Sequence, residues 1–352
     1  MRRILIMLVC FLPVAAWADY VQVKRSANIY ASPDRNTRIL ESVQPEESGQ
    51  PVFLLIASNK LQNGYHKVRL LQGSRTGWIY KSRVRLFSGD PPGIERDDFY
   101  GGLPDDSQVG DQITRIKNAA YTVGYSETKS NPLWSAYQLG ADQGHKCDRL
   151  KRFRTDDRTE TRVTHDAYNS TGYDRGHMAP SDNIGSRYGC EAQNETYFMS
   201  NITPQLPSLN QKSWLGLEML EASYPEDFGQ VWVITGPIFD PVWLNLLCSG
   251  VELPVSFYKI IVRDIDEKPS VLAVIFDQNT KPGVELSTLV TTVDEIERRT
   301  GIDFLSSLSD DLENSIERTR ATDSRWKLNT KLNSSFPGTA REICVEEPVR
   351  RN

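Results

Sequence analysis

Apolar and β-branched residues gather in short runs along most of the chain, and these runs predict strands. Five of them lie between residues 113 and 330 and have the composition of strands in a folded core: 121–125, 134–139, 231–235, 255–262 and 270–276. Two segments have the pattern of helices instead, at 209–223 and at 293–300, the second followed by Gly301. This mixture predicts an α/β (α+β) domain over residues 113–330.

The region from residue 19 to residue 88 has a different pattern. It holds only short alternating or apolar stretches, such as 21–23 and 51–56, separated by turn signals. We expect a separate small all-β domain here. Residues 89–112, rich in Gly and Pro, are expected to be a linker, and 331–352 a charged C-terminal tail.

The first eighteen residues have the features of a signal peptide. Arg2 and Arg3 precede an apolar run, and Ala16-Trp17-Ala18 offers small residues at a cleavage site. We expect cleavage after Ala18 and an exported product, either periplasmic or secreted by a bacterium. An uncleaved N-terminal anchor is the alternative. No later apolar run is long enough to predict a membrane span.

Cysteine usage agrees with export. If Cys10 leaves with the signal peptide, Cys147, Cys190, Cys248 and Cys344 remain. Four cysteines outside the cytosol predict two disulfides, with three pairings that the sequence leaves open. A structural zinc site is the rival interpretation, but the chain has no Cys-x-x-Cys pair and its cysteines are widely spaced.

The net charge is negative, which disfavours a protein that passively coats nucleic acid. The whole chain carries −5, and removal of the signal peptide leaves 39 basic against 46 acidic residues, a charge of −7. An enzyme that must release a polyanion needs only a local basic groove. One is available in a run of five basic residues, which could equally form a solvated face: Lys146, Arg149, Lys151, Arg152 and Arg154.

The strongest chemical signal is the segment 173–180, Tyr-Asp-Arg-Gly-His-Met-Ala-Pro. It is followed by Ser-Asn-Ile-Thr-Pro-Gln at 200–205, by Leu-Asn-Gln at 209–211, and by Thr-Gly-Pro at 235–237. In this order, these blocks resemble the DNA/RNA non-specific endonuclease family of the ββα-metal (His-Me finger) type. The resemblance extends through the Asp-Glu-Ile-Glu segment at 294–297.

The resemblance implies a fold and a reaction. The fold is a central antiparallel sheet with a ββα-metal finger, in which a hairpin presents His177 and the next helix presents Asn210. The reaction is hydrolysis of phosphodiester bonds in DNA and RNA, with Mg²⁺ or Mn²⁺ as cofactor and Asn210 as the metal ligand. His177 is the implied general base, because a histidine with a pKa of about 6.5 can take a proton from water at neutral pH.

Three further residues acquire expected roles. Asn210, Trp214 and Glu218 are spaced to share one face of a helix, which would bring Glu218 to the metal's waters. Asn201 matches a family asparagine that orients either the phosphate or the catalytic loop. Arg175 could neutralise phosphate or pair with Asp174.

Two departures from the family pattern concern basic residues. Enzymes of the Serratia nuclease type carry an arginine where this chain has Ala222. The upstream phosphate-binding arginine is also ambiguous, since Arg149, Arg152 and Arg154 all fall near its position. We favour Arg154.

The N-terminal region resembles bacterial SH3-like domains. The resemblance rests on Asn-Ile-Tyr-Ala-Ser-Pro at 28–33 and on Thr-Gly-Trp-Ile at 76–79. It implies a small barrel that binds a cell-wall or protein ligand. Oligomeric state, the ligand of this domain and any preference between DNA and RNA are not determined by the sequence.

Two rival functions are considered, the first because SH3-like domains on exported chains often accompany cell-wall hydrolases. A cell-wall hydrolase of the papain-like kind would use Cys147 as nucleophile and His177 as base. A catalytically inactive protein that binds nucleic acid or cell wall is the other alternative. The presence of both His177 and Asn210 argues against an inactive protein.

Overall fold

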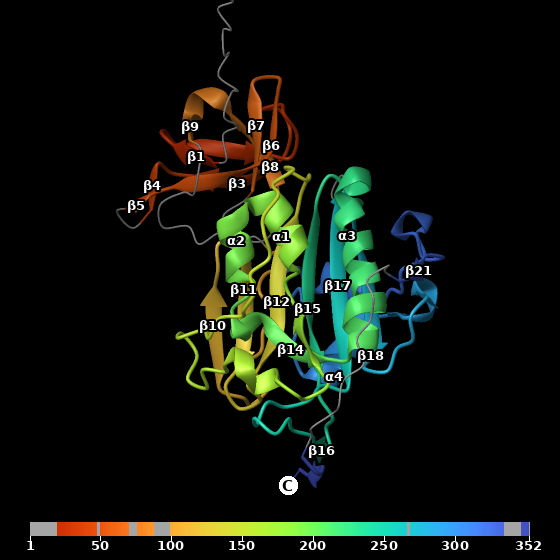
Figure 1. Cartoon of the computed structure of the whole chain (residues 1–352). Helices are drawn as coiled ribbons and strands as arrows, with labels where there is room; N and C mark the ends of the chain where they lie inside the picture. The colour runs from red at the N-terminus through yellow and green to blue at the C-terminus, as the bar shows by residue number, and fades with distance from the viewer. Residues whose placement is uncertain are drawn as a thin grey trace, which may run out of the picture. The chain divides into compact units, whose positions relative to one another are not determined.

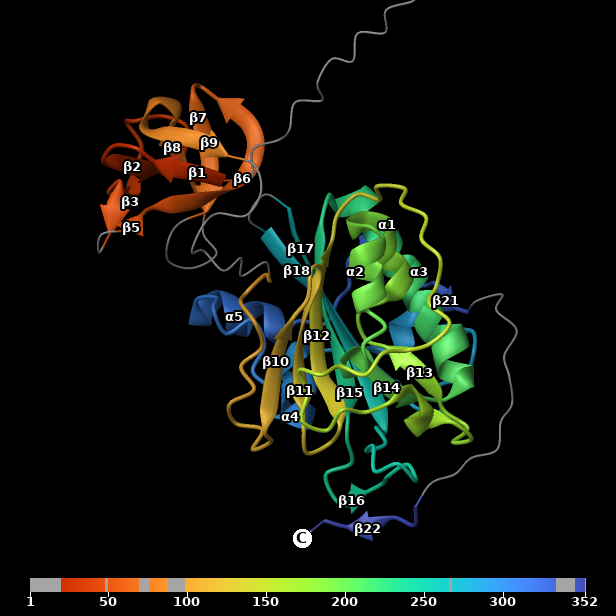
Figure 2. The same cartoon turned by 60° about the vertical axis from the view of Figure 1, so that its left-hand side comes forward.

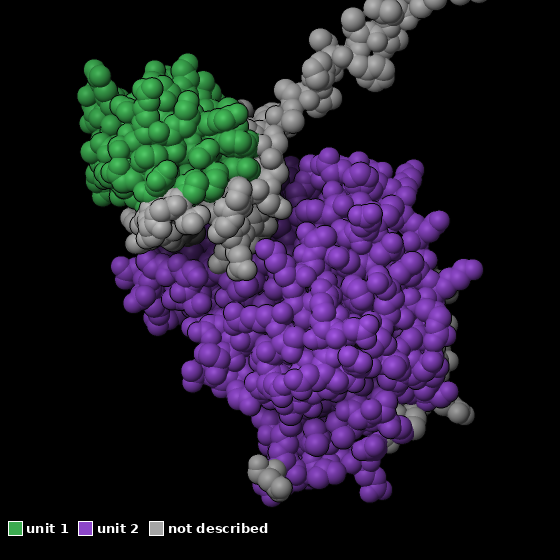
Figure 3. Space-filling view, turned by 90° about the vertical axis from the view of Figure 1, so that its left-hand side faces the viewer, with its two compact units in different colours: residues 1–96 green, residues 97–352 purple. Residues whose placement is uncertain are grey.

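The structure is a computed structural model (Figure 1), which describes residues 20–47, 50–69, 76–87, 99–265, 268–333 and 346–351. The chain divides into two compact units, residues 1–96 and 97–352 (Figure 3). The expected signal peptide and Cys344 lie outside the described residues. No helix within the described ranges is long and apolar enough to cross a membrane.

The N-terminal unit is all-β, as expected. Its main sheet is antiparallel, in the order β3-β2-β8-β7-β6-β1-β9. The strands are β1 Tyr20–Val23, β2 Ala27–Tyr30, β3 Ile39–Val43, β6 Phe53–Gln62, β7 Tyr65–Arg69, β8 Thr76–Tyr80 and β9 Val84–Phe87. A two-residue pair, β4 Glu46–Glu47 and β5 Gln50–Pro51, extends beside them. Alternate residues such as Ile29, Val68 and Ile79 point into one apolar core. The likeness to SH3-like domains stays a prediction.

The second unit is built on a seven-stranded antiparallel sheet in the order β10-β11-β12-β15-β17-β18-β20. All five strands predicted from the sequence are present, and their side chains are buried on both faces of the sheet. The bounds are β10 Ile113–Lys117, β11 Tyr121–Ser126, β12 Asn131–Leu139, β15 Val231–Ile238, β17 Ser256–Ile265, β18 Lys268–Asp277 and β20 Val290–Thr291.

Helices cover both faces of this sheet (Figure 2). Along β15, Val233 packs into the core under one set of helices, whereas Trp232 and Ile234 pack into the core under the other. The first set is α1 Ser181–Tyr188, α2 Cys190–Glu195 and α3 Leu215–Phe228, and the second is α4 Val293–Thr300 and α5 Asp310–Glu317. The predicted helix at 293–300 is confirmed. Thr292 caps its first turn, and Gly301 ends it at a φ of 72°.

The ββα finger lies on the face covered by α1, α2 and α3. Strand β13, Asp174–His177, pairs with β14, Ile202–Gln205, and places His177 opposite Ile202. A π-helical segment, η4 Leu209–Trp214, follows and leads directly into α3. The finger expected from the resemblance is therefore present, with α1 and α2 inserted between its strands.

Residues 99–112, expected to be linker, pack against the second unit. Phe99 is buried, Asp105 bridges to Asp303, and Asp106 accepts a hydrogen bond of 2.8 Å from Trp134 Nε1. Their turn-rich composition predicted the absence of regular structure but carried no signal of these long-range contacts. At the other end of the chain, β22 Val349–Arg350 pairs with β16 Trp243–Leu244, and β21 Lys331–Leu332 with β19 Val284–Glu285.

Candidate active site

A pocket of about 410 Å³ opens between the finger, α1 and α3. Five of the eight residues expected at the site line it: Arg149, Arg175, His177, Asn210 and Glu218. The other three, Arg152, Arg154 and Asn201, are not among its lining residues. Sequence reasoning did not assign to the site several residues that do line it: Phe153, Asp182, Asn183, Tyr197 and Gln211.

His177 is fixed by its strand and by two aromatic rings. Its ring centroid lies 5.2 Å from that of Phe153 and 5.1 Å from that of Tyr197, which meets it edge-on. Its Nε2 is buried and has no hydrogen-bond partner among the described residues. Burial, reinforced by the charge of Arg149, lowers the pKa of His177 to about 3. The imidazole is therefore neutral at physiological pH, and a negative charge beside it, such as that of a phosphate, would raise its pKa toward the range in which a base is effective.

The loop after His177 is held by Asn201. The Asn201 side chain is fully buried, and its Oδ1 accepts hydrogen bonds from Ala179 N at 2.9 Å and from Ser135 Oγ at 3.0 Å. Its Nδ2 donates to the carbonyl oxygens of Ala179 and Thr196, both at 3.0 Å. All four bonds are thus made within the protein. Of the two roles considered for Asn201, this geometry favours orientation of the loop.

Asn210 is oriented by a carboxylate. Its Nδ2 donates to Asp174 Oδ2 at 3.0 Å, and Gln211 Nε2 donates to the same oxygen at 2.6 Å. A carboxylate oxygen accepts only from the nitrogen of an amide, so this bond fixes which way the amide of Asn210 is turned. Asp174 thereby links the first strand of the finger to the start of its helix.

The expectation that Trp214 shares a face with Asn210 and Glu218 is wrong. Trp214 is fully buried and packs against Phe257 and Phe276, with ring centroids 5.8 and 5.5 Å away. The segment 209–214 is a π-helix, whose hydrogen bonds join residues five apart and not four. The face that begins at Asn210 therefore continues at Leu215, which lines the pocket together with Glu218.

Glu218 carries an unusual carboxyl group. Burial raises its pKa to about 8. Lys259 and Arg149 oppose this effect, while Glu221 and Asp182 add to it. The pocket alone thus provides too little positive charge to keep Glu218 ionised at neutral pH. The oxygen of Asn210 and the carboxylate of Glu218 are hard ligands of the type that Mg²⁺ prefers, so the residues present fit a divalent cation.

The three candidate arginines have different settings. Arg149 lines the pocket, donates to the Tyr197 hydroxyl at 3.2 Å and lies 3.7 Å from Asp182. Arg152 pairs with Asp166 at 3.1 Å on the surface. Arg154 is the arginine that we favoured from the family pattern. Its guanidinium lies 4.3 Å from the centre of the Phe198 ring. Spacing along the chain could not show which of the three points into the pocket.

Arg175 lines the pocket while it supports a neighbouring loop. Its Nη2 donates to the carbonyl oxygen of His165 at 2.6 Å and to Asn169 Oδ1 at 2.7 Å. His165 in turn accepts at Nδ1 from the Phe153 amide at 3.1 Å. These bonds hold the loop that carries Phe153 against the ring of His177.

A disulfide between Cys147 and Cys190 closes a loop with a sequence separation of 43 residues, which contains β13 and His177. Cys147 is one of the four cysteines expected to be oxidised, and Cys248 is also disulfide-bonded. Because the sulfur of Cys147 is cross-linked, it cannot serve as a thiolate nucleophile. The papain-like alternative is therefore wrong.

Known proteins resemble this chain in sequence and in fold. The family model described as DNA/RNA non-specific endonuclease matches residues 105–311. A nuclease of Serratia marcescens is 31% identical over 223 residues, which cover 59% of this chain and 81% of that protein. Mitochondrial endonuclease G of Homo sapiens is 28% identical over 209 residues, covering 54% and 68%. The solved structure of EndoG from its complex with EndoGI has a TM-score of 0.56 at 24% identity, over 62% of this chain and 95% of that one.

The matched residues include the whole finger, α1 to α4 and every residue named above as lining the pocket. The solved structure has the same fold, and the relatives in sequence are named as nucleases. On these grounds the protein is a nuclease, a hydrolase of phosphodiester bonds, and the chain belongs to the DNA/RNA non-specific endonuclease family.

Proposed function

We propose that this nuclease is an exported, Mg²⁺-dependent enzyme that cuts DNA and RNA without sequence preference, with His177 as general base and Asn210 as metal ligand. One observation carries the proposal. The neutral, buried imidazole of His177 lines the same pocket as Asn210, Glu218 and Arg149. Two further pockets of the second unit, one lined by Glu295 and Arg320 and the other by Phe239 and Arg351, contain no histidine.

His177 takes the proton from the water that attacks phosphorus. Its neutral form has a free lone pair, and the rings of Phe153 and Tyr197 restrict its motion. Asn201 holds the backbone that follows it. A positioned base of this kind accelerates a reaction by a factor on the order of 10²–10⁴.

The charge that develops on phosphate needs positive partners. Arg149 lines the pocket and can neutralise a phosphoryl oxygen, with Arg175 at the same wall. Bound Mg²⁺, or Mn²⁺, would supply further positive charge to the phosphate and to the departing 3′ oxygen. Asn210, oriented by Asp174, would bind the ion, Glu218 would hold its waters, and the ion's presence would favour the ionised form of Glu218.

Export rests on two independent features. The sequence begins with the pattern of a signal peptide, and Cys147 and Cys190 are joined in a disulfide of the kind that persists outside the reducing cytosol. A periplasmic or secreted bacterial enzyme fits both. Mass spectrometry of the mature protein should find Asp19 at its N-terminus, and retention of residues 1–18 would contradict cleavage.

The test of the central proposal is incubation of the purified full chain with plasmid DNA and with RNA, in Mg²⁺ and in EDTA. We expect both substrates to be cut in Mg²⁺ and neither in EDTA. Cleavage that persists in EDTA would show that the metal is not needed. Cleavage of only one substrate would refute the lack of sugar preference.

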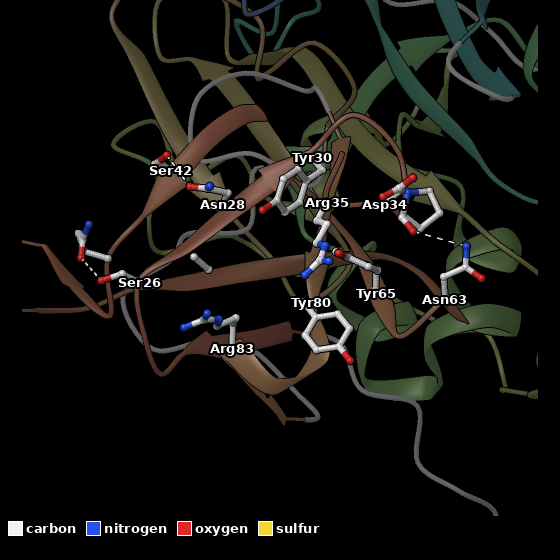
Figure 4. A pocket seen from close by; sticks show the side chains of 13 residues that line it. Ser26, Asn28, Tyr30, Asp34, Arg35, Ser42, Asn63, Tyr65, Tyr80 and Arg83 are labelled. Atoms are coloured by element: carbon white, nitrogen blue, oxygen red, sulfur yellow. Dashed lines mark hydrogen bonds between the residues drawn. The ribbon is translucent and has the colours of Figure 1, made fainter. Parts of the chain in front are cut away.

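We propose that the N-terminal unit binds a cell-wall or protein ligand. A polar groove of about 880 Å³ lies on this unit, and Figure 4 shows the rings of Tyr30, Tyr65 and Tyr80 around the guanidinium of Arg35. Asp34 and Arg83 also line the groove. Aromatic faces beside both signs of charge suit a ligand with polar and apolar parts. Binding of purified cell wall by the wild-type chain, and loss of binding in Tyr65→Ala, would support a wall ligand.

A further inference from the structure

A second group of carboxylates lies on the face of the central sheet that α4 and α5 cover, away from the nuclease pocket. Figure 2 shows these two helices across the sheet from α1, α2 and α3. The group is formed by five side chains: Asp294 and Glu297 on α4, Asp303 on the following loop, and Glu313 and Glu317 on α5. None of them lines the pocket that holds His177.

The five carboxylates form two sets of three that share Glu317. One ligand oxygen from each of Asp294, Glu297 and Glu317 lies within 4.8 Å of the other two, and the same holds for Asp303, Glu313 and Glu317. Ca²⁺ binds oxygens at 2.3–2.6 Å, so two ligands on opposite sides of the ion are about 5 Å apart. Each set is therefore compact enough to share one ion.

Glu317 supplies an independent observation. Its side chain is only 7% exposed, and its Oε1 is buried without a hydrogen-bond partner among the described residues. Burial of a polar group without a partner is costly, and buried charges are normally paired or bound to metal. Another buried glutamate of the same unit, Glu221, has partners for its carboxylate. Glu221 accepts from Lys259 at 2.6 Å, from Tyr137 at 2.8 Å and from Asn183 at 3.0 Å.

Four neighbouring carboxylates act on Glu317, those of Glu297, Glu313, Asp294 and Asp303. Burial, together with the neighbouring carboxylates, raises the pKa of Glu317 to about 8 and that of Glu297 to about 7. Two contacts partly offset this charge. Glu297 Oε1 accepts from the Phe304 amide at 2.9 Å, and Arg318 lies 3.9 Å from Asp294 at the exposed edge. Neither contact involves Glu317.

We propose that this cluster is a binding site for a divalent cation, and that the ion is Ca²⁺ held by Glu317 and by the two other carboxylates of one of its sets. Several carboxylates around one ion suit Ca²⁺, whereas Mg²⁺ keeps most of its waters and takes one or two. The ion would tie α4 to α5 and stabilise the helical layer behind the sheet. It is distinct from the ion proposed for the nuclease pocket.

The first test is thermal unfolding of the full chain, stripped with EDTA and then titrated with Ca²⁺ or with Mg²⁺. We expect Ca²⁺ at about a hundred times its Kd to raise the melting temperature by roughly 5 °C, and Mg²⁺ to do so only at higher concentration. The variant Asn210→Ala, altered only in the nuclease pocket, should keep the Ca²⁺ shift. Loss of the shift in this variant, or its absence in the wild type, would overturn the proposal.

The second test is Glu317→Gln. In EDTA this variant should melt at or above the temperature of the wild type, because glutamine has no carboxyl group whose ionisation the neighbouring carboxylates oppose, and this also shows that it folds. It should lose the Ca²⁺ shift and the heat of Ca²⁺ binding in calorimetry. Glu226→Gln, an exposed position on α3, is the matched control and should keep both. Retention of the shift in Glu317→Gln would place any Ca²⁺ site elsewhere.

Discussion

The carboxamide of Asn201 makes two hydrogen bonds to the backbone of Ala179, accepting from its amide at 2.9 Å and donating to its carbonyl at 3.0 Å. Ala179 is two residues beyond His177, and Asn201 immediately precedes β14. One buried side chain therefore joins the end of the first finger strand to the start of the second. The position of the proposed base depends on it.

We expect Asn201→Ala to lower kcat while it leaves KM nearly unchanged, because the loop moves but Arg149 and Asn210 still bind substrate and metal. Four buried hydrogen bonds lose a partner, so the free energy of unfolding should fall by about 2–3 kcal/mol. Ser135→Ala, which removes one of the four bonds, should show a smaller effect on both. Steady-state kinetics and urea unfolding measure the two quantities. A rise in KM at constant kcat would assign Asn201 to substrate binding instead.

His177→Ala should reduce kcat by a factor on the order of 10²–10⁴ without loss of folding or of affinity for nucleic acid. The base is deleted, whereas the arginines of the pocket remain. His145→Ala, at an exposed position on the loop before the disulfide, is the matched histidine control and should keep full activity. Single-turnover cleavage of a labelled duplex checks the rate, and filter binding checks the affinity. Activity within a few-fold of wild type would exclude His177 as the base.

Asn210→Ala should raise the Mg²⁺ concentration needed for half-maximal activity. Activity should recover partly at high Mg²⁺, because water and substrate phosphate supply the remaining ligands of this ion. Gln211→Ala removes the neighbouring amide from the same oxygen of Asp174 and should shift the Mg²⁺ curve less. An identical Mg²⁺ titration for Asn210→Ala and wild type would mean that the ion is held by other residues.

The Glu221–Lys259 pair should dominate the stability of the layer under the pocket. Both side chains are fully buried, so Lys259→Met leaves an uncompensated carboxylate and should cost about 3–5 kcal/mol of unfolding free energy. Adding Glu221→Gln to that variant should restore part of the loss. Lys327→Met breaks an exposed pair with Asp227 and should cost less than about 1 kcal/mol. Equal effects at the two lysines would contradict the role of burial.

Stability in EDTA should fall as the pH rises from 6.5 to about 8. Glu297 and Glu317 have pKa values raised to about 7 and 8 in the folded protein, whereas the unfolded chain ionises near 4.5. Over this interval the folded state holds more protons than the unfolded state, so deprotonation favours unfolding. Glu218 acts in the same direction. His177, with its lowered pKa, acts in the opposite direction only below pH 6.5.

The pH effect is checked by urea midpoints across this range. The charges that face Glu317 are Asp294, Glu297, Asp303 and Glu313, with Arg318 at the edge. Glu317→Gln should flatten the dependence because it removes the group with the highest pKa in the cluster. A midpoint that does not change with pH in the wild type would show that these carboxyls are ionised in the folded state.

Sequence patterns predicted the parts of the fold that local rules determine. The five long strands are rich in β-branched and aromatic residues, and the helix at 293–300 has both a capping Thr292 and a terminal Gly301. The short helices α1 and α2 were not predicted, because their apolar stripe is weak and they are stabilised by contacts with distant segments. One such contact is the hydrogen bond from Gln193 to Ser181, at 3.1 Å.

At the site, the motif identified His177 and Asn210 but not what surrounds them. Asp174 belongs to the motif, but its contact with Asn210 could not be predicted, because only the folded hairpin brings the two side chains together. Tyr197 lies in no motif and reaches His177 through the loop after α2. The π-helix at 209–214 has no recognisable sequence pattern, so an ordinary helix was assumed and Trp214 was assigned to the wrong face.

The bond between Cys147 and Cys190 has a consequence for where the enzyme can work. It ties the loop that carries Arg149 to α2, and a link across this many residues stabilises a fold by about 4 kcal/mol. In the cytosol, thiol reductants keep such cysteines in the reduced thiol form. There the loop would be held by noncovalent contacts alone, next to the cell's own chromosome and transcripts. The cross-link thus makes the geometry of the pocket dependent on the redox state of its surroundings, and under the proposed export the enzyme would acquire its full rigidity only outside the cytosol.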